Sequence, residues 1–208
     1  MSVLVYTESW KGKFRKSTFE AVSYASETAK LLATDVVALS FGEVTDEDLN
    51  KLGNYGASKV LSASGVNKGD SQQTSNLFAE NLADASIIIF ANSYAAKMIA
   101  PRLAIKLKVG IASNVITVPS STSPVTITRK AFSGKAIEKT VINSEKAILT
   151  LAPNAFGLVE CGGNYWNQFN GRCYWNELGM NTNVFTSSRF RLHTLLYHRI
   201  FDCQEGWG

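Results

Sequence analysis

The first 160 residues of this 208-residue chain contain neither cysteine nor histidine. Without cysteine thiolates, that part of the chain forms no disulfide and no thiolate metal site. Its serines have no imidazole base beside them, and no thiol is present to act as a nucleophile. Disulfide scaffolds, zinc ribbons and Ser–His or Cys–His hydrolases are therefore excluded over most of the sequence.

Long apolar runs and long basic runs are also absent. No apolar stretch approaches the ~20 residues that cross a bilayer, so we expect no membrane insertion. The opening "MSVLVYTESWKGKF" has no basic start and no small-residue cleavage site, which indicates a cytoplasmic protein without a signal peptide. The formal net charge of +4 is not gathered into a basic run, so nucleic acid is not an expected partner.

The fingerprints of nucleotide-binding loops are missing as well. No GxGxxG follows the first predicted strand, and no GxxxxGK[ST] occurs anywhere. The glycine-containing "SGVNKGDS" (64–71) lacks the spacing of a phosphate cradle and is interpreted as a surface loop. "TESWKGKF" (7–14) follows the first strand, where a ligand would sit, but is interpreted as a solvated loop with Trp10 packed against the body. We therefore predict no catalytic, cofactor-binding or metal-binding residue.

Two charged features of the sequence could have either a structural or a functional role. Asp46, Glu47 and Asp48 fall in the first turn of a predicted helix, where carboxylates complement the helix dipole, and this structural role is preferred. Arg102 follows Pro101 and is one of three arginines before residue 161. Its guanidinium fits a carboxylate or phosphate of a partner, an internal salt bridge, or a side chain that snorkels to solvent.

The composition changes near residue 160. Residues 161–208 hold all three cysteines and both histidines, and they contain four arginines but no lysine. The side chains of zinc-ligand type are Cys161, Cys173, Cys203, His193 and His198. Eleven residues separate the first two cysteines, so a CxxC knuckle is missing and we predict no zinc site. The segment is interpreted as an irregular tail, with a partner-binding segment as the alternative.

Apolar periodicity predicts alternating strands and helices through residue 118. Strands are predicted at 2–6, 35–41, 58–63, 86–90 and 109–118, and helices at 17–32, 45–52, 72–83 and 94–108. "SIIIF" (86–90) is typical of a central strand buried on both faces. This alternation predicts parallel crossover units.

Local signals place the helix ends. Ser17 and Glu20 have capping-box spacing at the start of the first helix, and Thr45 and Asp48 repeat it at the second. Gly53 is expected to stop the second helix. Pro101 is expected to kink the last helix or to restart it, because proline has no amide donor.

The pattern changes from Pro124. "VTITRKAF" and "KAIEKTVIN" flank Ser133-Gly134 and predict an antiparallel hairpin, and "AILTLAP" (147–153) predicts a further strand. The predicted fold is α/β and Rossmann-like, with three layers: a mostly parallel sheet with helices on both faces, plus this late hairpin. The domain is predicted to span residues 1–158, and residues 159–208 form the atypical tail.

Three blocks of sequence resemble the N-terminal domain of the electron transfer flavoprotein alpha subunit. They are "VLVYTESWKGKFRKSTFEAVSYA", "IIIFANSYAAKMIAPRLAIKLKVGIASNV" and "ITRKAFSGKAIEKTV". The PRLAxKL-type helix and the RxxFxGKA-type hairpin carry the resemblance, which covers about residues 2–158. It implies a fold similar to the adenine-nucleotide-hydrolase-like superfamily. It also implies an electron carrier, not an enzyme of its own, which pairs with a beta subunit and passes electrons from flavin dehydrogenases through one FAD to the respiratory chain.

The resemblance lapses where the composition changes. In the family, a C-terminal domain with an "SGGRG"-type stretch holds most of the FAD, and residues 161–208 are too few for that domain and lack its motifs. No FAD-binding residue is therefore carried onto this sequence, which is interpreted as a truncated or frameshifted alpha subunit. The alternatives are a stand-alone nucleotide-binding α/β protein and a beta-subunit-binding fragment without redox activity.

Overall fold

The computed structural model describes residues 2–63, 69–81, 85–161 and 190–194. A mixed sheet has the strand order β10-β9-β7-β11-β6-β1-β4-β5-β12. Its strands are β1 (Ser2–Thr7), β4 (Val36–Phe41), β5 (Lys59–Ala63), β6 (Ala85–Ala91), β7 (Gly110–Val115), β9 (Val125–Ala131), β10 (Ala136–Ile142), β11 (Ala147–Leu151) and β12 (Phe190–Thr194), while β8 (Ser121–Thr122) pairs with β9. The helices are α1 (Lys16–Leu32), α2 (Asp46–Lys51), α3 (Ser71–Asn81) and α4 (Tyr94–Leu107).

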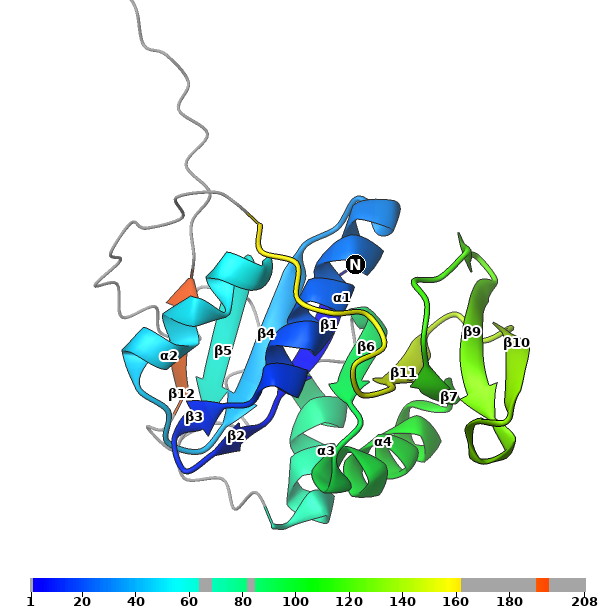
Figure 1. Cartoon of the computed structure of the whole chain (residues 1–208). Coiled ribbons are helices and arrows are strands. Elements are labelled where there is room, and N and C mark those ends of the chain that lie inside the picture. Colours follow the sequence, from blue (N-terminus) through cyan, green and yellow to red (C-terminus); the bar gives the residue numbers. More distant parts are fainter. Residues whose placement is uncertain (1, 64–68, 82–84, 162–189, 195–208) are drawn as a thin grey trace, which may run out of the picture.

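The parallel part of the sheet is buried on both faces. Strands β11, β6, β1, β4 and β5 run parallel, and β7 joins them parallel to β11. Alternate residues of β6 enter two core clusters: Ile87 and Ile89 pack on the side of α1, and Ile88 packs on the side of α3 and α4. Figure 1 shows α1 across one face and α3 beside α4 on the other. The predicted three-layer α/β fold is confirmed.

The order in which the chain adds strands to the sheet reverses between β1 and β6. From β1 the chain crosses to β4 and then to β5, whereas β6 returns to the opposite side of β1. The carboxyl ends of strands at such a switch point form the usual ligand crevice of this architecture. This architecture therefore predicts a nucleotide site, where one is present, at the carboxyl ends of β1 and β6.

The late hairpin is confirmed and widens the sheet with antiparallel strands. β9 and β10 pair in register, with Glu138 opposite Arg129, and an ion pair of 2.9 Å joins those two side chains. The turn Phe132–Gly134 has three successive residues with positive φ, of 50°, 53° and 82°. Two of them are not glycine, and non-glycine residues seldom adopt this conformation. The turn therefore holds a conformation that its own sequence does not favour.

The capping box predicted at the start of the first helix is wrong, whereas the signals of the second helix are confirmed. Helix α1 begins at Lys16 with Arg15 as its N-cap, and no side chain makes a capping hydrogen bond there, because Glu20 is used elsewhere. The second helix ends at Lys51 with Leu52 as its C-cap, so it stops before Gly53 as predicted, and the left-handed residue that closes the following turn is Gly56 (φ 103°). The Thr45 cap is confirmed, since its Oγ1 accepts from the Asp48 amide at 3.4 Å.

Pro101 neither ends α4 nor restarts it. The helix runs as one element from Tyr94 to Leu107, with the Ser93 hydroxyl accepting from the Ala96 amide at its start. Pro101 and Lys97 both face solvent. The Lys97 carbonyl that loses its helical partner at Pro101 therefore lies on the wet side of the helix, where water can satisfy it.

Three short pairings were not predicted from the sequence. Residues 9–14 form a small hairpin from β2 (Ser9–Trp10) and β3 (Lys13–Phe14), and β8 is a two-residue strand. Within the predicted irregular tail, β12 pairs antiparallel with β5. Among the helices described, none is long and apolar enough to cross a membrane.

Candidate functional site

Two threonine hydroxyls near the switch point are buried and donate to backbone carbonyls of the chain. Thr7, at the end of β1, is fully buried and donates its hydroxyl to the Leu39 carbonyl at 2.9 Å. Thr18, in the first turn of α1, is also buried and donates to the Glu8 carbonyl at 3.0 Å. These hydroxyls are satisfied internally, so they do not form a phosphate cradle.

The loop after β1 differs from its interpretation in one respect. It is solvated, as predicted, but Trp10 does not pack against the body. Its ring is exposed, and the Arg15 guanidinium lies 4.9 Å from the ring centroid. A cation over an indole face is a favourable contact. Of the other loop, 64–71, residues 64–68 lie outside the described chain, and Asp70 caps α3 by accepting from the Gln72 and Gln73 amides.

Glu20 is the most deeply buried carboxylate of the described chain, with 2% of its surface exposed. It lies on α1, and it accepts three backbone hydrogen bonds from the loop after β11. The amide of Asn154 donates to Oε2 at 3.1 Å, and the amides of Phe156 and Gly157 donate to Oε1 at 2.9 and 3.1 Å. Hydrogen bonds to a carboxylate are among the stronger ones in proteins.

Residues 152–161 continue from this contact across the outer face of α1, and we call them the strap. Ser23 donates its hydroxyl to the Val159 carbonyl and accepts from the Val159 amide, both at 3.2 Å. Farther along, the Cys161 amide donates to the Asn54 carbonyl at 2.9 Å. Figure 1 shows the strap in yellow over α1. Helix α1 is therefore enclosed between the sheet and the strap, and the described chain stays packed beyond residue 158.

Tyr24 connects the strap to the core. Its ring packs edge-on against Phe156 with centroids 5.5 Å apart, and its hydroxyl donates to the Thr117 carbonyl at 2.9 Å. Burial raises the pKa of Tyr24 well above its ordinary value. Burial, followed by the charge of Glu8, raises the pKa of Tyr6 in the same direction.

We expect these tyrosines to limit stability at alkaline pH. A raised pKa in the folded state contributes stability that is present below the unfolded pKa of about 10 and is lost as the pH rises above it. Tyr24→Phe should cost about 1 kcal/mol at pH 7 through the lost hydrogen bond, and should make the fall in stability between pH 9 and 11 shallower. Urea denaturation at pH 7, 9 and 11 measures both effects.

The matched control is Tyr94→Phe, which removes a hydroxyl from a side chain on the surface. It should leave the free energy of unfolding at pH 7 within about 0.5 kcal/mol of the parent. If the free energy of unfolding falls as steeply between pH 9 and 11 in Tyr24→Phe as in the parent, Tyr24 is not the cause of that fall.

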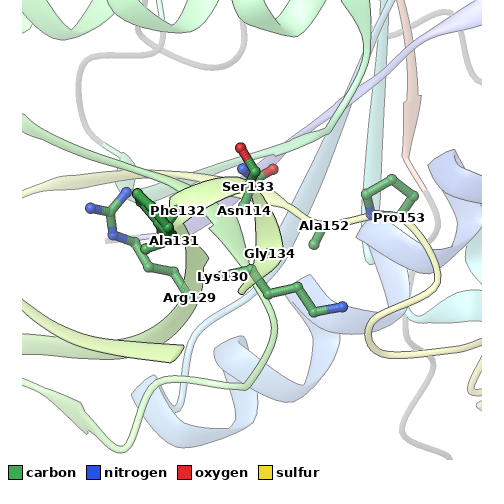
Figure 2. A pocket seen from close by; sticks show the side chains of 9 residues that line it. All are labelled: Asn114, Arg129, Lys130, Ala131, Phe132, Ser133, Gly134, Ala152 and Pro153. Atoms are coloured by element: carbon green, nitrogen blue, oxygen red, sulfur yellow. The ribbon is translucent and has the colours of Figure 1, made fainter. Parts of the chain in front are cut away.

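A pocket of about 420 Å³ lies between the hairpin turn and the carboxyl ends of β7 and β11. Its lining residues are Asn114, Arg129, Lys130, Ala131, Phe132, Ser133, Gly134, Ala152 and Pro153. Arg129 and Lys130 extend to opposite sides in Figure 2, as neighbours on a strand do. Arg129 is already paired with Glu138, and the Asn114 side chain accepts from Asn92 at 2.8 Å. Lys130 also borders the pocket, and it makes no ion pair with a residue that the structure describes.

One face of the sheet at the antiparallel extension carries exposed apolar side chains, and we call it the hairpin face. It consists of Ile111, Ile137 and Val141. Ile111 is the register partner of Ile148, which belongs to the core on the α4 side. Ile137 and Val141 alternate with Glu138, whose partner Arg129 is opposite Val115 of the α1-side core. All three isoleucine and valine side chains therefore point to the α4 side of the sheet.

A family model described as "Electron transfer flavoprotein domain" matches residues 3–165. The chain belongs to this electron transfer flavoprotein family. The electron transfer flavoprotein subunit alpha of Bacillus subtilis (strain 168) is 29% identical over 160 residues, which are 73% of this chain and 47% of that protein. The electron transfer flavoprotein subunit alpha of Syntrophomonas wolfei subsp. wolfei (strain DSM 2245B / Goettingen) is 29% identical over 162 residues, 76% of this chain and 49% of that protein.

This electron transfer flavoprotein domain thus spans about half the length of the curated relatives it matches. The family match extends seven residues beyond the boundary predicted at residue 158. It includes the whole strap.

In the described part of the electron transfer flavoprotein domain, the backbone amides of Asn154, Phe156 and Gly157 already bind the Glu20 carboxylate. An internal anion thus takes the place that a phosphate would need. At the start of α1, the side chain of Arg15 stacks on Trp10.

The remaining candidates of the electron transfer flavoprotein domain do not form a site together. Asp46, Glu47 and Asp48 lie in the first turn of α2, and a hydrogen bond from Lys51, followed by one from Thr45, lowers the pKa of Asp48. Arg102 is exposed and makes no ion pair with any residue that the structure describes.

The zinc-type side chains are only partly within the described residues. Cys161 lies beside Ser26, with Sγ and Oγ 3.7 Å apart, and His193 is a residue of β12 opposite Val60. Cys173, Cys203 and His198 lie outside the described residues. No group of three metal-ligand side chains occurs in the part of the chain that the structure describes.

Proposed function

We propose that this chain serves as the alpha-type N-terminal domain of an electron transfer flavoprotein and pairs with a beta-type subunit through the hairpin face. In this role it is part of an electron carrier and not a catalyst of its own. The family match and the two alpha-subunit relatives support the alpha-type assignment. The hairpin face is the observation that carries the proposed pairing.

Exposed apolar side chains on an edge of a sheet are typical of a protein interface. Ile137 is 73% exposed and Val141 is 50% exposed, although each is large and apolar. Both belong to β10, the edge strand, so the backbone groups along its outer side also lack a strand partner in the described sheet. Burial of a side chain of this size contributes roughly 1.5–3 kcal/mol, so a partner that covers both gains a useful share of its affinity.

We propose further that the FAD of the complex is held outside residues 1–158. The Glu20 carboxylate occupies the amide cluster that could have received a phosphate, which supports this view. On this proposal residues 1–158 supply the alpha-type domain of the chain, and other residues hold the flavin. Its complex accepts electrons from flavin dehydrogenases only if the flavin finds enough donors in the beta subunit and in residues beyond the strap.

Co-expression with a beta subunit of an electron transfer flavoprotein tests the proposal. We expect a heterodimer in size-exclusion chromatography, and the visible spectrum of that heterodimer then reports flavin. Bound flavin supports a working carrier, and a stable complex without flavin supports a structural subunit. Failure to form a complex, together with AMP or ATP binding by the isolated chain in calorimetry, would instead support a stand-alone nucleotide-binding protein.

The pair Ile137→Asp and Leu31→Asp locates the interface. Leu31 is 56% exposed on α1, on the other face of the sheet, so it matches Ile137 in chemistry and exposure. Ile137→Asp should weaken the heterodimer at least about tenfold, because a buried unpaired carboxylate costs more than the lost apolar contact. Leu31→Asp should leave the dissociation constant unchanged. Equal effects of the two variants would place the interface elsewhere.

A further inference from the structure

The outer face of α4 carries a stripe of apolar side chains that are more than half exposed. The side chains of Tyr94, Met98 and Ile105 are 89%, 52% and 78% exposed, and Pro101 between them is exposed too. Their spacing of four, three and four residues places them on one line along the helix. The buried side of the same helix is made of other residues, among them Ile99 and Leu103. The stripe therefore adds nothing to the core.

Basic side chains line both sides of this stripe. At 3.6 residues per turn, Lys97 falls on one side of the line from Tyr94 to Ile105, and Arg102 and Lys106 fall on the other, while Lys108 is the C-cap of the helix. None of the four makes an ion pair with a described residue. Lys97 lies over the Tyr94 ring, 5.9 Å from its centroid, and so extends the stripe with its own aliphatic stem.

The sequence around α4 contains no compensating carboxylate. Between residues 85 and 137 there is no aspartate or glutamate, whereas seven lysines and arginines occur there. Surface helices of soluble domains normally carry both signs of charge, which limits self-association and non-specific binding. A one-sided positive charge around an apolar line is complementary to an acidic surface with an apolar ridge.

We propose that this stripe, Tyr94, Met98, Pro101 and Ile105 with its flanking cations, is a docking surface for an acidic protein segment. The segment would be an amphipathic helix that places apolar side chains on the stripe and carboxylates against Lys97, Arg102 and Lys106. This surface shares no residue with the hairpin face, and this inference stands without the pairing proposed above.

A protein fits the stripe better than a lipid surface does. Helices that insert into the membrane interface present tryptophan, phenylalanine or leucine along a broad apolar face. This stripe is narrow and consists of tyrosine, methionine, proline and isoleucine. Tyrosine and methionine are enriched in the cores of protein interfaces, where methionine adapts to varied partner shapes.

Fluorescence anisotropy with a designed helical peptide tests the inference on the full chain. The probe is a labelled peptide of about five turns with leucines on one line and glutamates on both sides of it, compared with the same peptide carrying glutamine for glutamate. The chain should bind the glutamate peptide at least about tenfold more tightly, and this preference should shrink as salt is added. Equal binding of the two peptides would overturn the proposal.

Three variants locate the binding on α4. Met98→Asp and the double variant Lys97→Glu/Arg102→Glu should each weaken binding of the glutamate peptide at least about tenfold. Lys139→Glu, which changes one exposed cation of β10, is the control and should leave binding within about twofold. An effect of Lys139→Glu as large as that of the double variant would overturn the proposal, because binding would then follow net charge alone. The proposal would also be overturned if the chain does not bind the peptide but sediments with vesicles of phosphatidylcholine and phosphatidylserine.

Discussion

Glu20→Gln should lower the free energy of unfolding by about 3 kcal/mol, although the two side chains have nearly the same shape. In the folded chain, both carboxylate oxygens accept backbone amides of the strap. Glutamine has a single acceptor oxygen, so it can keep the Phe156 and Gly157 amides only by turning its own NH2 toward the Asn154 amide. The glutamine NH2 and the Asn154 amide, both hydrogen-bond donors, would then face each other in the protein interior. An unsatisfied buried donor costs roughly 1–3 kcal/mol.

Urea denaturation of Glu20→Gln and Glu27→Gln measures this effect. Glu27 lies on the same helix and pairs with Lys30 on the surface. Its replacement should cost no more than about 0.5 kcal/mol, because exposed ion pairs contribute little. Hydrogen exchange of the Asn154, Phe156 and Gly157 amides should speed up only in Glu20→Gln. Equal stability of the two variants would show that the strap does not depend on Glu20.

Gly56→Ala should destabilise the protein by about 3–4 kcal/mol. A Cβ atom at residue 56 would lie 2.4 Å from the Ser26 Oγ, 2.6 Å from the Ser26 Cβ and 3.2 Å from the Cys161 Sγ. The hydroxyl can rotate away, but the Cβ of Ser26 is fixed to α1, so the helix and the segment around Gly56 must separate. Overpacking of this kind costs roughly 1–3 kcal/mol, and the φ of 103° at Gly56 adds backbone strain for any L-residue.

Gly134→Ala separates the two causes. Gly134 also has a positive φ, of 82°, but a Cβ there meets no atom within 4 Å. Its replacement should therefore show the conformational cost alone, about 1–2 kcal/mol. Ser26→Gly should recover part of the loss when it is combined with Gly56→Ala, which a double-mutant cycle quantifies. If Gly134→Ala costs as much as Gly56→Ala, the contact with Ser26 is not the cause.

Elements that depend on local sequence were predictable. The β-branched run of β6 and the alternating residues of β9 and β10 were each found from a few neighbouring residues, because burial on two faces and hairpin pairing leave a short-range pattern. The Thr45 cap was found for the same reason. The antiparallel extension and the three layers followed from the order of these elements.

The strap was not predictable in this way. Its contacts join residues more than 130 positions apart, such as Glu20 with Gly157 and Ser23 with Val159. Glu20 has the spacing of a capping box, and only the position of the loop after β11 shows that the carboxylate is used elsewhere. The α4 stripe was missed for a related reason. Pro101 was interpreted as a kink or a restart of the helix, although in the folded helix it is one member of an exposed line.

The strap also decides how the chain leaves the domain. Because hydrogen bonds hold residues 154 to 161 against α1 and Asn54, the backbone up to Cys161 is fixed to the domain. A group attached there explores a smaller volume than it would on a flexible tether of the same length, which raises its effective concentration near the domain. Loosening the strap, as in Glu20→Gln, should therefore slow any reaction between the domain and a group tethered beyond Cys161.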